Sequence, residues 1–313
     1  MSNNSDSIVA LADPQERTSR GAILIVVLMV LVVMSLIVMQ FSFTMSLNRM
    51  IAVNNSEITQ LAYMALGGVE YAKNALRADR QLGETDSFLD SWANIELPYE
   101  PPFKTEVTVQ DECGKMNVNA LIAPNGALNT PVKEALERLF ENMDINIEAV
   151  HRLADYLDPD TDGDFEDGAR NAPLDDLTDL LNIEYITPDV FFGVPAQSED
   201  DKPVLGLVSL LTIQGPGQVN INTAPEEVIM ALFGKAREEL AQFLEYREKN
   251  AIRDLQEVAQ IGFSSATIGP MICYTSDYYR VISRAYNDRI SRTAECLVVR
   301  GNRKITVIEQ RNY

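Results

Sequence analysis

The first regular feature of the chain is an unbroken apolar run near its N-terminus. Ala22–Met39 contains one polar residue, Ser35, and no charged residue stands between Arg20 and Arg49. At about 1.5 Å of rise per residue, a helix of this length crosses a bilayer. Because Arg17 and Arg20 precede the run, the N-terminus is expected in the cytoplasm and the rest of the chain on the other side of the membrane.

The helical pattern continues beyond this run. Apolar residues recur at alternating steps of four and three, which places them on one face of a helix. They are Ile58, Ala62, Ala65, Val69, Ala72 and Leu76. No proline occurs between Gly21 and Leu97, and the pair Gly67-Gly68 bends a helix without having to end it. The pattern predicts one helix over about 22–80, roughly 90 Å long, whose second half packs on a soluble domain.

Strand patterns flank a mainly helical middle region. Apolar residues alternate over 103–110, and β-rich segments follow at the C-terminus over 278–285, 291–300 and 304–311. Gly301-Asn302 is a turn signal between the last two. The order predicts an α+β unit in which the N-terminal helix packs on a sheet, with the helical region inserted between strands.

The middle region contains an internal repeat. GKMNVNALIAP (Gly114–Pro124) and GQVNINTAPEE (Gly217–Glu227) share the core Asn-[Val/Ile]-Asn. Helices are expected over 130–141 and 147–157 after the first copy, and over 225–233, 237–249 and 255–261 after the second. A polar linker, Asp200–Pro203, separates the halves. Two related helical modules are therefore predicted.

The charge and composition of the chain disfavour two classes of function, nucleic-acid binding and enzymatic catalysis. The net charge of −20 over 313 residues disfavours a nucleic-acid partner, because phosphate binding requires a basic face. The chain has one histidine, His151, and the sequence shows neither a Ser-His-Asp set nor a phosphate-binding glycine loop. Three cysteines, Cys113, Cys273 and Cys296, are too few for a disulfide framework. A Cys273–Cys296 bond and free thiols are both compatible with the spacing, and we do not expect an enzyme.

The acidic loop DPDTDGDFEDG (Asp158–Gly168) is the candidate site. Asp158, Asp160, Asp162 and Gly163 match the opening D-x-D-x-D-G of an EF-hand loop, in which alternate residues point oxygens at one centre. Oxygen ligands without histidine or cysteine favour Ca²⁺ over transition metals. The alternative is a solvated acidic turn without a metal.

The closing half of the chelate departs from the EF-hand pattern. Asp164 and Glu166 fall at the seventh and ninth positions, but Ala169 stands at the twelfth, where a bidentate glutamate belongs. Asp167, or Asp175 or Asp176 further along, would then complete the set. The candidate ligands are Asp158, Asp160, Asp162, Asp164, Glu166 and Asp167, and the expected role of the metal is structural.

The N-terminal junction resembles the processing site of type IV pilin-like proteins. A polar leader, residues 1–21, ends at Gly21, directly before Ala22 and the apolar run. In proteins of that class a prepilin peptidase cuts after the glycine on the cytoplasmic side, and the apolar helix stays on the mature protein. The alternative is a plain single-pass anchor.

Four stretches in order resemble the type II secretion minor pseudopilin K family (general secretion pathway protein K). They are RGAILIVVLMVL, DECGKMNVNALI, NAPLDDLTDLLNI and VNINTAPEEVIMAL. The resemblance implies a pilin-like long helix packed on a small antiparallel sheet, with a large helical insertion. The expected parts are a leader (1–21), a transmembrane part (22–47), a pilin-like domain (48–113 and 276–313) and an insertion of two helix-hairpin-helix-like modules (114–275).

The resemblance also implies a place in an assembly. Val26 is the fifth residue counted from Ala22, where most pilin-like subunits carry glutamate and the K family lacks it. A carboxylate in lipid is costly unless paired, so a subunit without it suits a tip position with no subunit above. The implied setting is the inner membrane, with the bulk of the chain in the periplasm, minor pseudopilins I and J and the major pseudopilin as partners, and Ca²⁺ in the insertion. A related pilus system remains open.

A DNA-uptake protein is the competing interpretation, because VNINTAPEEVIMAL and the residues after it also resemble helix-hairpin-helix DNA-binding domains. Such domains need backbone amides at a glycine-rich hairpin and basic side chains facing phosphates. The first hairpin, Phe233–Glu239, lacks paired glycines, and the second, Gln260–Gly269, has no basic residue. DNA binding is therefore the less favoured function.

Overall fold

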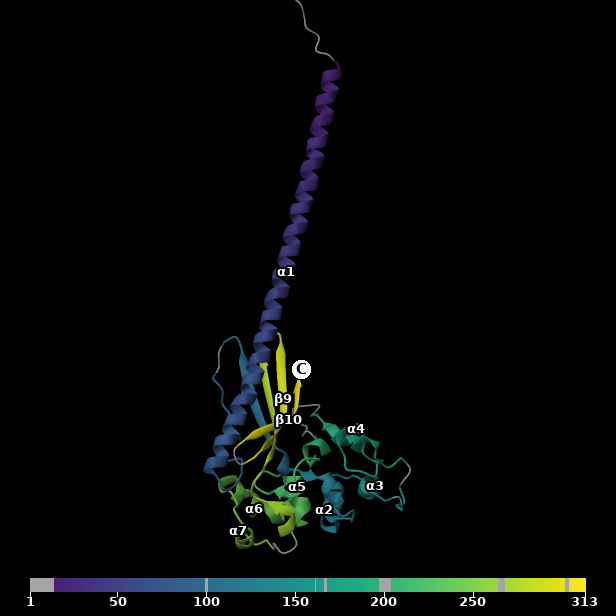
Figure 1. Ribbon diagram of the computed structural model, residues 1–313, viewed down its shortest axis with the longest axis vertical. Coiled ribbons are helices and arrows are strands. Elements are labelled where there is room, and N and C mark those ends of the chain that lie inside the picture. Colours follow the sequence, from purple (N-terminus) through teal and green to yellow (C-terminus); the bar gives the residue numbers. More distant parts are fainter. Residues whose placement is uncertain are drawn as a thin grey trace, which may run out of the picture. The chain divides into compact units, whose positions relative to one another are not determined.

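The structure, a computed structural model, describes residues 14–98, 101–160, 162–165, 168–196, 204–263, 268–301 and 304–313. The chain divides into two compact units, Met1–Gln60 and Leu61–Tyr313. Helix α1 (Pro14–Leu82) contributes its first part to one unit and its last part to the other. The units are therefore described one at a time (Figure 1).

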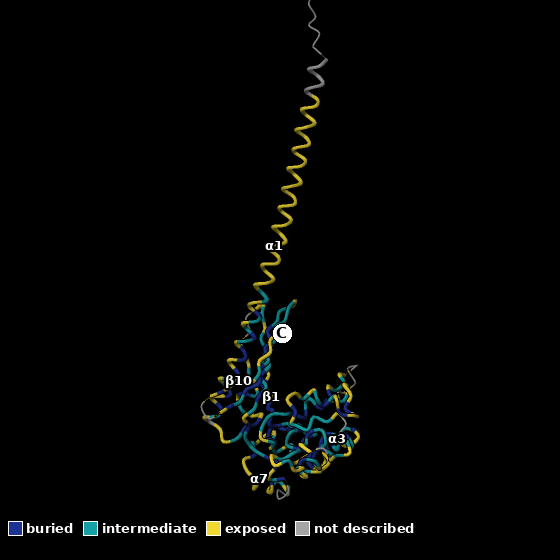
Figure 2. Tube along the Cα trace, turned by 45° about the vertical axis from the view of Figure 1, so that its right-hand side comes forward, coloured by how far each residue is buried: buried dark blue, intermediate teal, exposed yellow. Residues whose placement is uncertain are grey.

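The N-terminal unit is the first part of α1. The sequence predicted a start near residue 22, but the helix begins at Pro14 and continues through Gly21, so the predicted start was wrong. A glycine weakens a helix by about 1 kcal/mol relative to alanine without ending it, and proline suits a first turn. The stretch from Gly21 is long and apolar enough to cross a membrane, and its residues are exposed as far as residue 56 (Figure 2).

The second unit contains a four-stranded antiparallel sheet covered on one face by the end of α1. Its strands lie in the order β1 (Lys104–Asp111), β8 (Tyr278–Tyr286), β9 (Ser291–Arg300) and β10 (Ile305–Asn312). The helix buries one stripe of side chains in the core beneath it, namely Leu61, Ala65, Val69, Ala72 and Leu76. Four of these were predicted, whereas Leu61 takes the place expected for Ile58 and Ala62, which are only partly buried.

The two glycines of α1 have different environments. A Cβ added at Gly68 would lie 2.8 Å from Val107 Cγ2 and 3.1 Å from Ser283 Cβ, closer still to Ser283 Oγ, whereas one at Gly67 would have no atom within 4 Å. Gly68 therefore lets the helix backbone approach β1 and β8 closely. The helix runs through both glycines without ending.

The chain between β1 and β8 forms two modules with their own apolar core (Figure 1). The first runs through β2 (Met116–Asn117), α2 (Thr130–Asn142), α3 (Glu148–Leu157), the 3₁₀ helix η3 (Leu177–Asn182), η4 (Leu207–Ser209) and β5 (Leu211–Thr212). The second runs through β6 (Val219–Asn220), α5 (Glu226–Phe233), α6 (Arg237–Lys249), α7 (Leu255–Gln260), η5 (Gly269–Met271) and β7 (Ile272–Cys273). In each module the first and last strands pair in parallel.

The first module adds a segment to this common plan. It consists of α4 (Pro188–Phe192) and the short antiparallel pair β3 (Gly193–Val194) and β4 (Val204–Leu205), all between η3 and η4. The second module has no counterpart among its described residues. The connection after β1 is the 3₁₀ turn η1 (Glu112–Gly114), and a second one, η2 (Val118–Leu121), follows β2.

The repeated asparagines explain why the two modules share one shape. In the second module, Asn222 accepts a hydrogen bond from Ile252 N at 2.8 Å and donates to Ile252 O at 2.9 Å. In the first, Asn119 accepts from Leu174 N at 2.8 Å and donates to Leu174 O at 3.0 Å. Each asparagine side chain therefore fixes the backbone just before the third helix of its own module.

Candidate functional site

The acidic loop begins where α3 ends. Asp158 is the C-terminal cap of α3, and Asp160 Oδ1 accepts a hydrogen bond from Asp162 N at 3.1 Å. Asn171 donates from its side chain to Asp160 O at 2.8 Å, which brings the end of the loop back to its beginning. Asp164 is exposed. Glu166 and Asp167, the last two candidate ligands, lie outside the described residues.

The described loop acids do not form a compact cluster of carboxylates. Within the described ranges, the three acidic side chains whose oxygens lie within 4.8 Å of one another are Asp79, Asp86 and Asp90, elsewhere in the fold. The donor chemistry of the loop suits Ca²⁺, but the described residues hold only part of the expected ligand set. Calcium binding by the loop therefore stays a prediction.

Asp175 and Asp176, the alternative closing ligands, have other partners. Arg170 forms ion pairs with Asp175 and, at 2.8 Å, with Asp179. Asp176 caps η3 by accepting from Thr178 N at 2.9 Å, and this hydrogen bond is the main reason that the pKa of Asp176 lies below its usual value. Both acids thus fix the start of η3.

The repeat shows that the acidic loop is an extension of the first module. In the second module, one residue, Ala251, separates the helix cap Asn250 from the fixed residue Ile252. In the first, Pro159–Pro173 separates the equivalent cap Asp158 from Leu174. The common fold of a module needs no such loop, so its acidic residues are available for a role of their own.

A buried ionic cluster lies beside the end of α1, and sequence reasoning missed it. Arg300 donates to Asp79 at 3.0 Å, to both oxygens of Asp86 at 2.5 Å and to Ser276 O at 2.7 Å. Its guanidinium lies 5.0 Å from the centre of the Tyr279 ring. The guanidinium already supplies positive charge to these carboxylates, so the cluster fits a structural role better than a metal site.

Asp111 joins the sheet to the second module. This fully buried carboxylate accepts hydrogen bonds from Ser276 Oγ at 2.5 Å, Thr223 Oγ1 at 2.6 Å, Asn220 Nδ2 at 3.1 Å and Cys113 N at 2.8 Å. Burial raises the pKa of Asp111 to about 6, although these donors favour the charged form. No sequence pattern marks this residue, because its partners lie up to 165 positions away.

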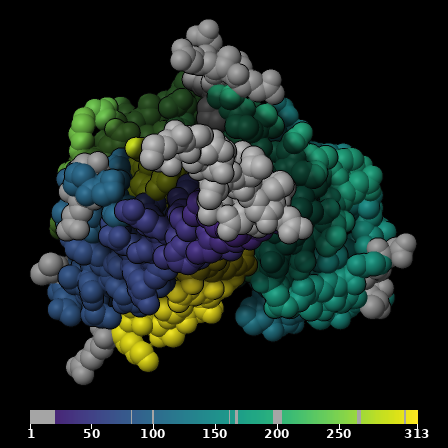
Figure 3. All heavy atoms as spheres, turned by 90° about the horizontal axis from the view of Figure 1, so that it is seen from above, coloured from purple at the N-terminus to yellow at the C-terminus, as the bar shows by residue number. Residues whose placement is uncertain are grey.

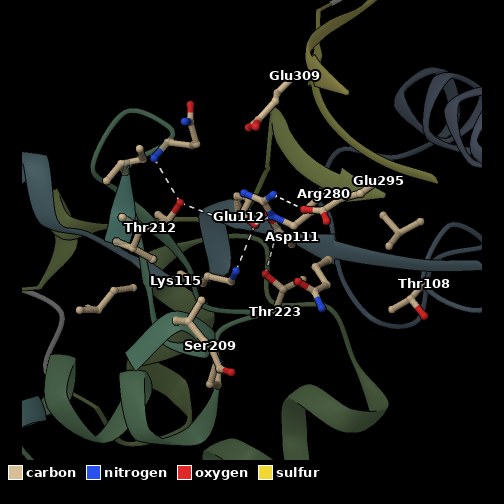
Figure 4. Close-up of a pocket in the computed structure, with 18 of the residues that line it drawn as sticks. Thr108, Asp111, Glu112, Lys115, Ser209, Thr212, Thr223, Arg280, Glu295 and Glu309 are labelled. Atoms are coloured by element: carbon tan, nitrogen blue, oxygen red, sulfur yellow. Dashed lines mark hydrogen bonds and ion pairs between the residues drawn. The ribbon is translucent and has the colours of Figure 1, made fainter. Parts of the chain in front are cut away.

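A cleft of about 980 Å³ lies between the outer face of the sheet and the first module. Figure 4 shows Glu112, Arg280 and Glu295 on its floor, with Glu309 pointing in from β10. Glu112 is 2% exposed and accepts from Arg280 at 2.9 Å, from Lys115 at 3.1 Å and from Thr212 Oγ1 at 2.7 Å. No sequence pattern predicted this site, since its residues come from separate strands and turns.

The fold is that of a solved secretion protein. The structure matches a chain in the crystal structure of the GspK-GspI-GspJ complex from the enterotoxigenic Escherichia coli type 2 secretion system, with a TM-score of 0.60 and 17% sequence identity. The match covers 83% of this chain and 98% of that chain. The predicted α+β fold is thereby confirmed.

A family model matches the second module. Residues 219–271 match the model of the family described as type II secretion system (T2SS), protein K. Together with the shared fold, this partial match supports a minor pseudopilin of the K type. Among curated proteins no match was found. The apolar N-terminal helix of this chain fits a single-pass membrane anchor. A minor pseudopilin is a structural component of a secretion system, which is consistent with the expectation that the chain is not an enzyme.

Proposed function

We propose that the chain caps the tip of a periplasmic pseudopilus, together with minor pseudopilins I and J, and assists protein export across the outer membrane. The K-family match of the second module carries this proposal. Two further features support it. Val26 stands where most pilin-like subunits carry a glutamate that pairs with a neighbour. Two bulky modules are inserted between β1 and β8, and an insertion of this size would obstruct stacking inside a fibre.

Co-purification tests the capping proposal. The full chain, carrying an affinity tag at its C-terminus and extracted in nonionic detergent, is expected to retain I and J encoded by the same genome. The major pseudopilin is expected to bind to this trio and not to the chain alone. Recovery of the chain without I and J, under conditions in which I and J retain each other, would contradict the assignment.

Membrane insertion and processing form a separate proposal. We infer that prepilin peptidase cuts between Gly21 and Ala22, and that the helix after the cut anchors the chain in the inner membrane with the second unit in the periplasm. Gly21 is exposed on α1 with open space around its Cα. N-terminal sequencing of the mature chain should begin at Ala22. A mature chain that keeps residues 1–21 would refute processing while leaving the anchor intact.

We propose that Asp158, Asp160, Asp162 and Asp164, completed by Glu166 or Asp167, bind one structural Ca²⁺. The support is the oxygen-only donor set and the fold-back of Asn171 onto Asp160, which closes the loop. The status of the loop as an extension of the module favours a dedicated role for its acids. Bound Ca²⁺ would hold the loop between α3 and Leu174.

A loop replacement tests calcium binding. We expect chelator to lower the melting temperature of the full chain and Ca²⁺ to restore it. In the matched variant, a single alanine replaces Pro159–Pro173, as Ala251 does in the second module. This variant should fold and lose its response to Ca²⁺. An unchanged calcium response in the variant would place the ion elsewhere, and no response in the parent chain would refute binding.

In its described part the second module has one exposed basic side chain, Arg253, without an ion pair, which is too few for a DNA-binding face. Lys235, Arg237 and Lys249 pair with Glu239, Glu226 and Glu245 at 2.6–2.8 Å. Arg247 is mostly buried and donates to two backbone carbonyls, Ile221 O and Ala224 O. Counterion release needs unpaired cations at the phosphates, so we expect no retention of duplex DNA on filters at low salt. Tight retention would favour the DNA-uptake function.

A further inference from the structure

The cleft between the sheet and the first module has two different walls. The sheet contributes side chains of β8, β9 and β10, including Arg280, Glu295 and Glu309. The module contributes the start of η3, the end of α4 and η4, including Asp176, Phe192 and Val208. Its volume of about 980 Å³ is at the upper end of the range of about 300–1,000 Å³ found for ligand sites. In Figure 3 a notch lies between the yellow C-terminal strands and the teal first module.

The cleft is acidic. Its lining has six acidic residues and three basic ones. The acids are Asp111, Glu112, Asp175, Asp176, Glu295 and Glu309, and the bases are Lys115, Arg280 and Arg311. Each base has an acidic partner at 2.5–3.1 Å: Lys115 pairs with Glu112, Arg280 with Glu112 and Glu295, and Arg311 with Glu309. Arg170, which lies outside the lining, also pairs with Asp175, and Asp111 is buried. Asp176 is therefore the accessible acid of the lining that has no ion pair with a base among the described residues, and its charge favours a cationic ligand over an anionic one.

Two exposed aromatic rings line the same cleft. Phe88 is 59% exposed and Phe192 is 60% exposed. Phe192 packs edge-to-face on the buried Phe191, with ring centroids 4.8 Å apart, so its position is fixed. A fixed, exposed ring beside a charged floor is a typical anchor point for an apolar side chain of a partner.

We propose that this cleft binds an extended segment of a partner protein in which a lysine or arginine stands beside an apolar side chain. The basic group would contact Asp176 and Glu309, and the apolar group would contact Phe192. A bare metal ion is a poorer occupant, because in the described part of the chain no three acids of the cleft bring their oxygens within 4.8 Å of one another. This inference goes beyond tip capping and does not depend on I and J.

A defined peptide pair tests the charge requirement. The probe is fluorescein-labelled Gly-Lys-Phe-Lys-Gly, titrated with the full chain in nonionic detergent at low salt and followed by fluorescence anisotropy. Saturable binding is expected, and it should weaken as salt is added. The peptide Gly-Glu-Phe-Glu-Gly should not bind. Absence of saturable binding of the lysine peptide at millimolar protein would overturn the proposal.

Matched variants distinguish the cleft from the overall charge of −20. Asp176→Asn with Glu309→Gln should weaken binding about fivefold, because each exposed ion pair contributes a factor of roughly 1.4 to 5. Asparagine still caps a helix, so η3 should remain. The control pair, Glu238→Gln with Glu248→Gln, removes equal charge from exposed positions on α6. Equal weakening by both pairs would refute a specific site.

The apolar contact has its own control and its own measurement. Phe192→Ser should weaken binding, whereas Tyr71→Ser, an exposed aromatic on α1, should leave it unchanged. A probe with photoreactive benzoylphenylalanine in place of phenylalanine should crosslink to η3, α4 or η4. Crosslinks confined to other elements would overturn the proposal even if the peptide binds.

Discussion

Asp111 gives the sharpest prediction about stability. The carboxylate is fully buried, and burial raises its pKa from 3.8 to about 6. Its four hydrogen-bond donors come from the sheet connection, the second module and the chain entering β8. An acid whose pKa is higher in the folded protein binds its proton more tightly there. It therefore contributes most stability below its unfolded pKa, and this contribution is lost as pH rises through about 6.

The size of the effect follows from the shift. One pKa unit corresponds to about 1.4 kcal/mol, so a shift of about two units gives roughly 3 kcal/mol in the acid limit. Most of it, about 2 kcal/mol, develops between pH 8 and pH 4. Asp111→Asn cannot titrate, and its rearranged hydrogen bonds change stability by an amount independent of pH. The free energy of unfolding of the parent chain, relative to that of this variant, should therefore rise by about 2 kcal/mol as pH falls from 8 to 4.

The single tryptophan provides the assay. Trp92 is fully buried and packs edge-to-face on Tyr279, with ring centroids 5.2 Å apart. Tyr279 lies opposite Asp111 in the pairing of β1 with β8. Urea unfolding followed by Trp92 emission, at several pH values in detergent, gives the free energy of unfolding of this core. The same change at an exposed acid, Asp189→Asn, serves as the control. A constant difference between parent and Asp111→Asn across this pH range would refute the raised pKa.

Three further predictions concern stability and use the same unfolding assay. Gly68→Ala should destabilise the chain by about 1–3 kcal/mol, because the added methyl group overpacks the helix–sheet contact. Gly67→Ala, with open space, should stabilise it by up to about 1 kcal/mol, and equal effects of the two changes would contradict the close approach. Asn222→Ala should cost about 2–4 kcal/mol, since it leaves two buried backbone groups without partners, and more than Asn119→Ala, which is less buried. Arg300→Met should cost about 3–5 kcal/mol by leaving buried carboxylates uncompensated, and a neutral outcome would show that those carboxylates are protonated.

Local patterns predicted the elements well where local physics decides them. Helix α6 and strand β9 begin and end at the predicted residues. The repeat predicted two modules, and both share one order of helices and paired short strands, to which the first adds α4, β3 and β4. The pattern did not predict the side-chain hydrogen bonds that stabilise the fold of each module. The partners of Asn119 and Asn222 lie 55 and 30 positions away, and no periodicity records such contacts.

The candidate site was predictable only in part, for similar reasons. The opening of the acidic loop is visible because its acids are close in sequence. Asp175 and Asp176 were plausible closing ligands because they also lie close by in sequence. In the structure, however, Asp175 forms an ion pair with Arg170 and Asp176 caps the N-terminus of η3. The buried acids Asp79, Asp86 and Asp111 stand singly in the sequence. Only the folded chain shows that Arg300 and the hydrogen-bond donors around Asp111 offset the energetic cost of burying these carboxylates.

The internal repeat also connects the acidic loop to the cleft. Among the described residues, the acidic loop and the α4 segment are present in the first module and have no counterpart in the second. The loop leads directly into Asp175–Thr178, which lines the cleft, and α4 contributes Phe192 to the same lining. Arg170, at the end of the loop, pairs with Asp175 and Asp179 and so fixes the wall formed by η3. If Ca²⁺ orders the loop, it must also favour the arrangement of this wall, and by linkage a segment bound in the cleft must tighten calcium binding by the same factor. The acidic loop and the α4 segment would then act together, because Ca²⁺ bound by the loop would order one wall of a protein-binding cleft.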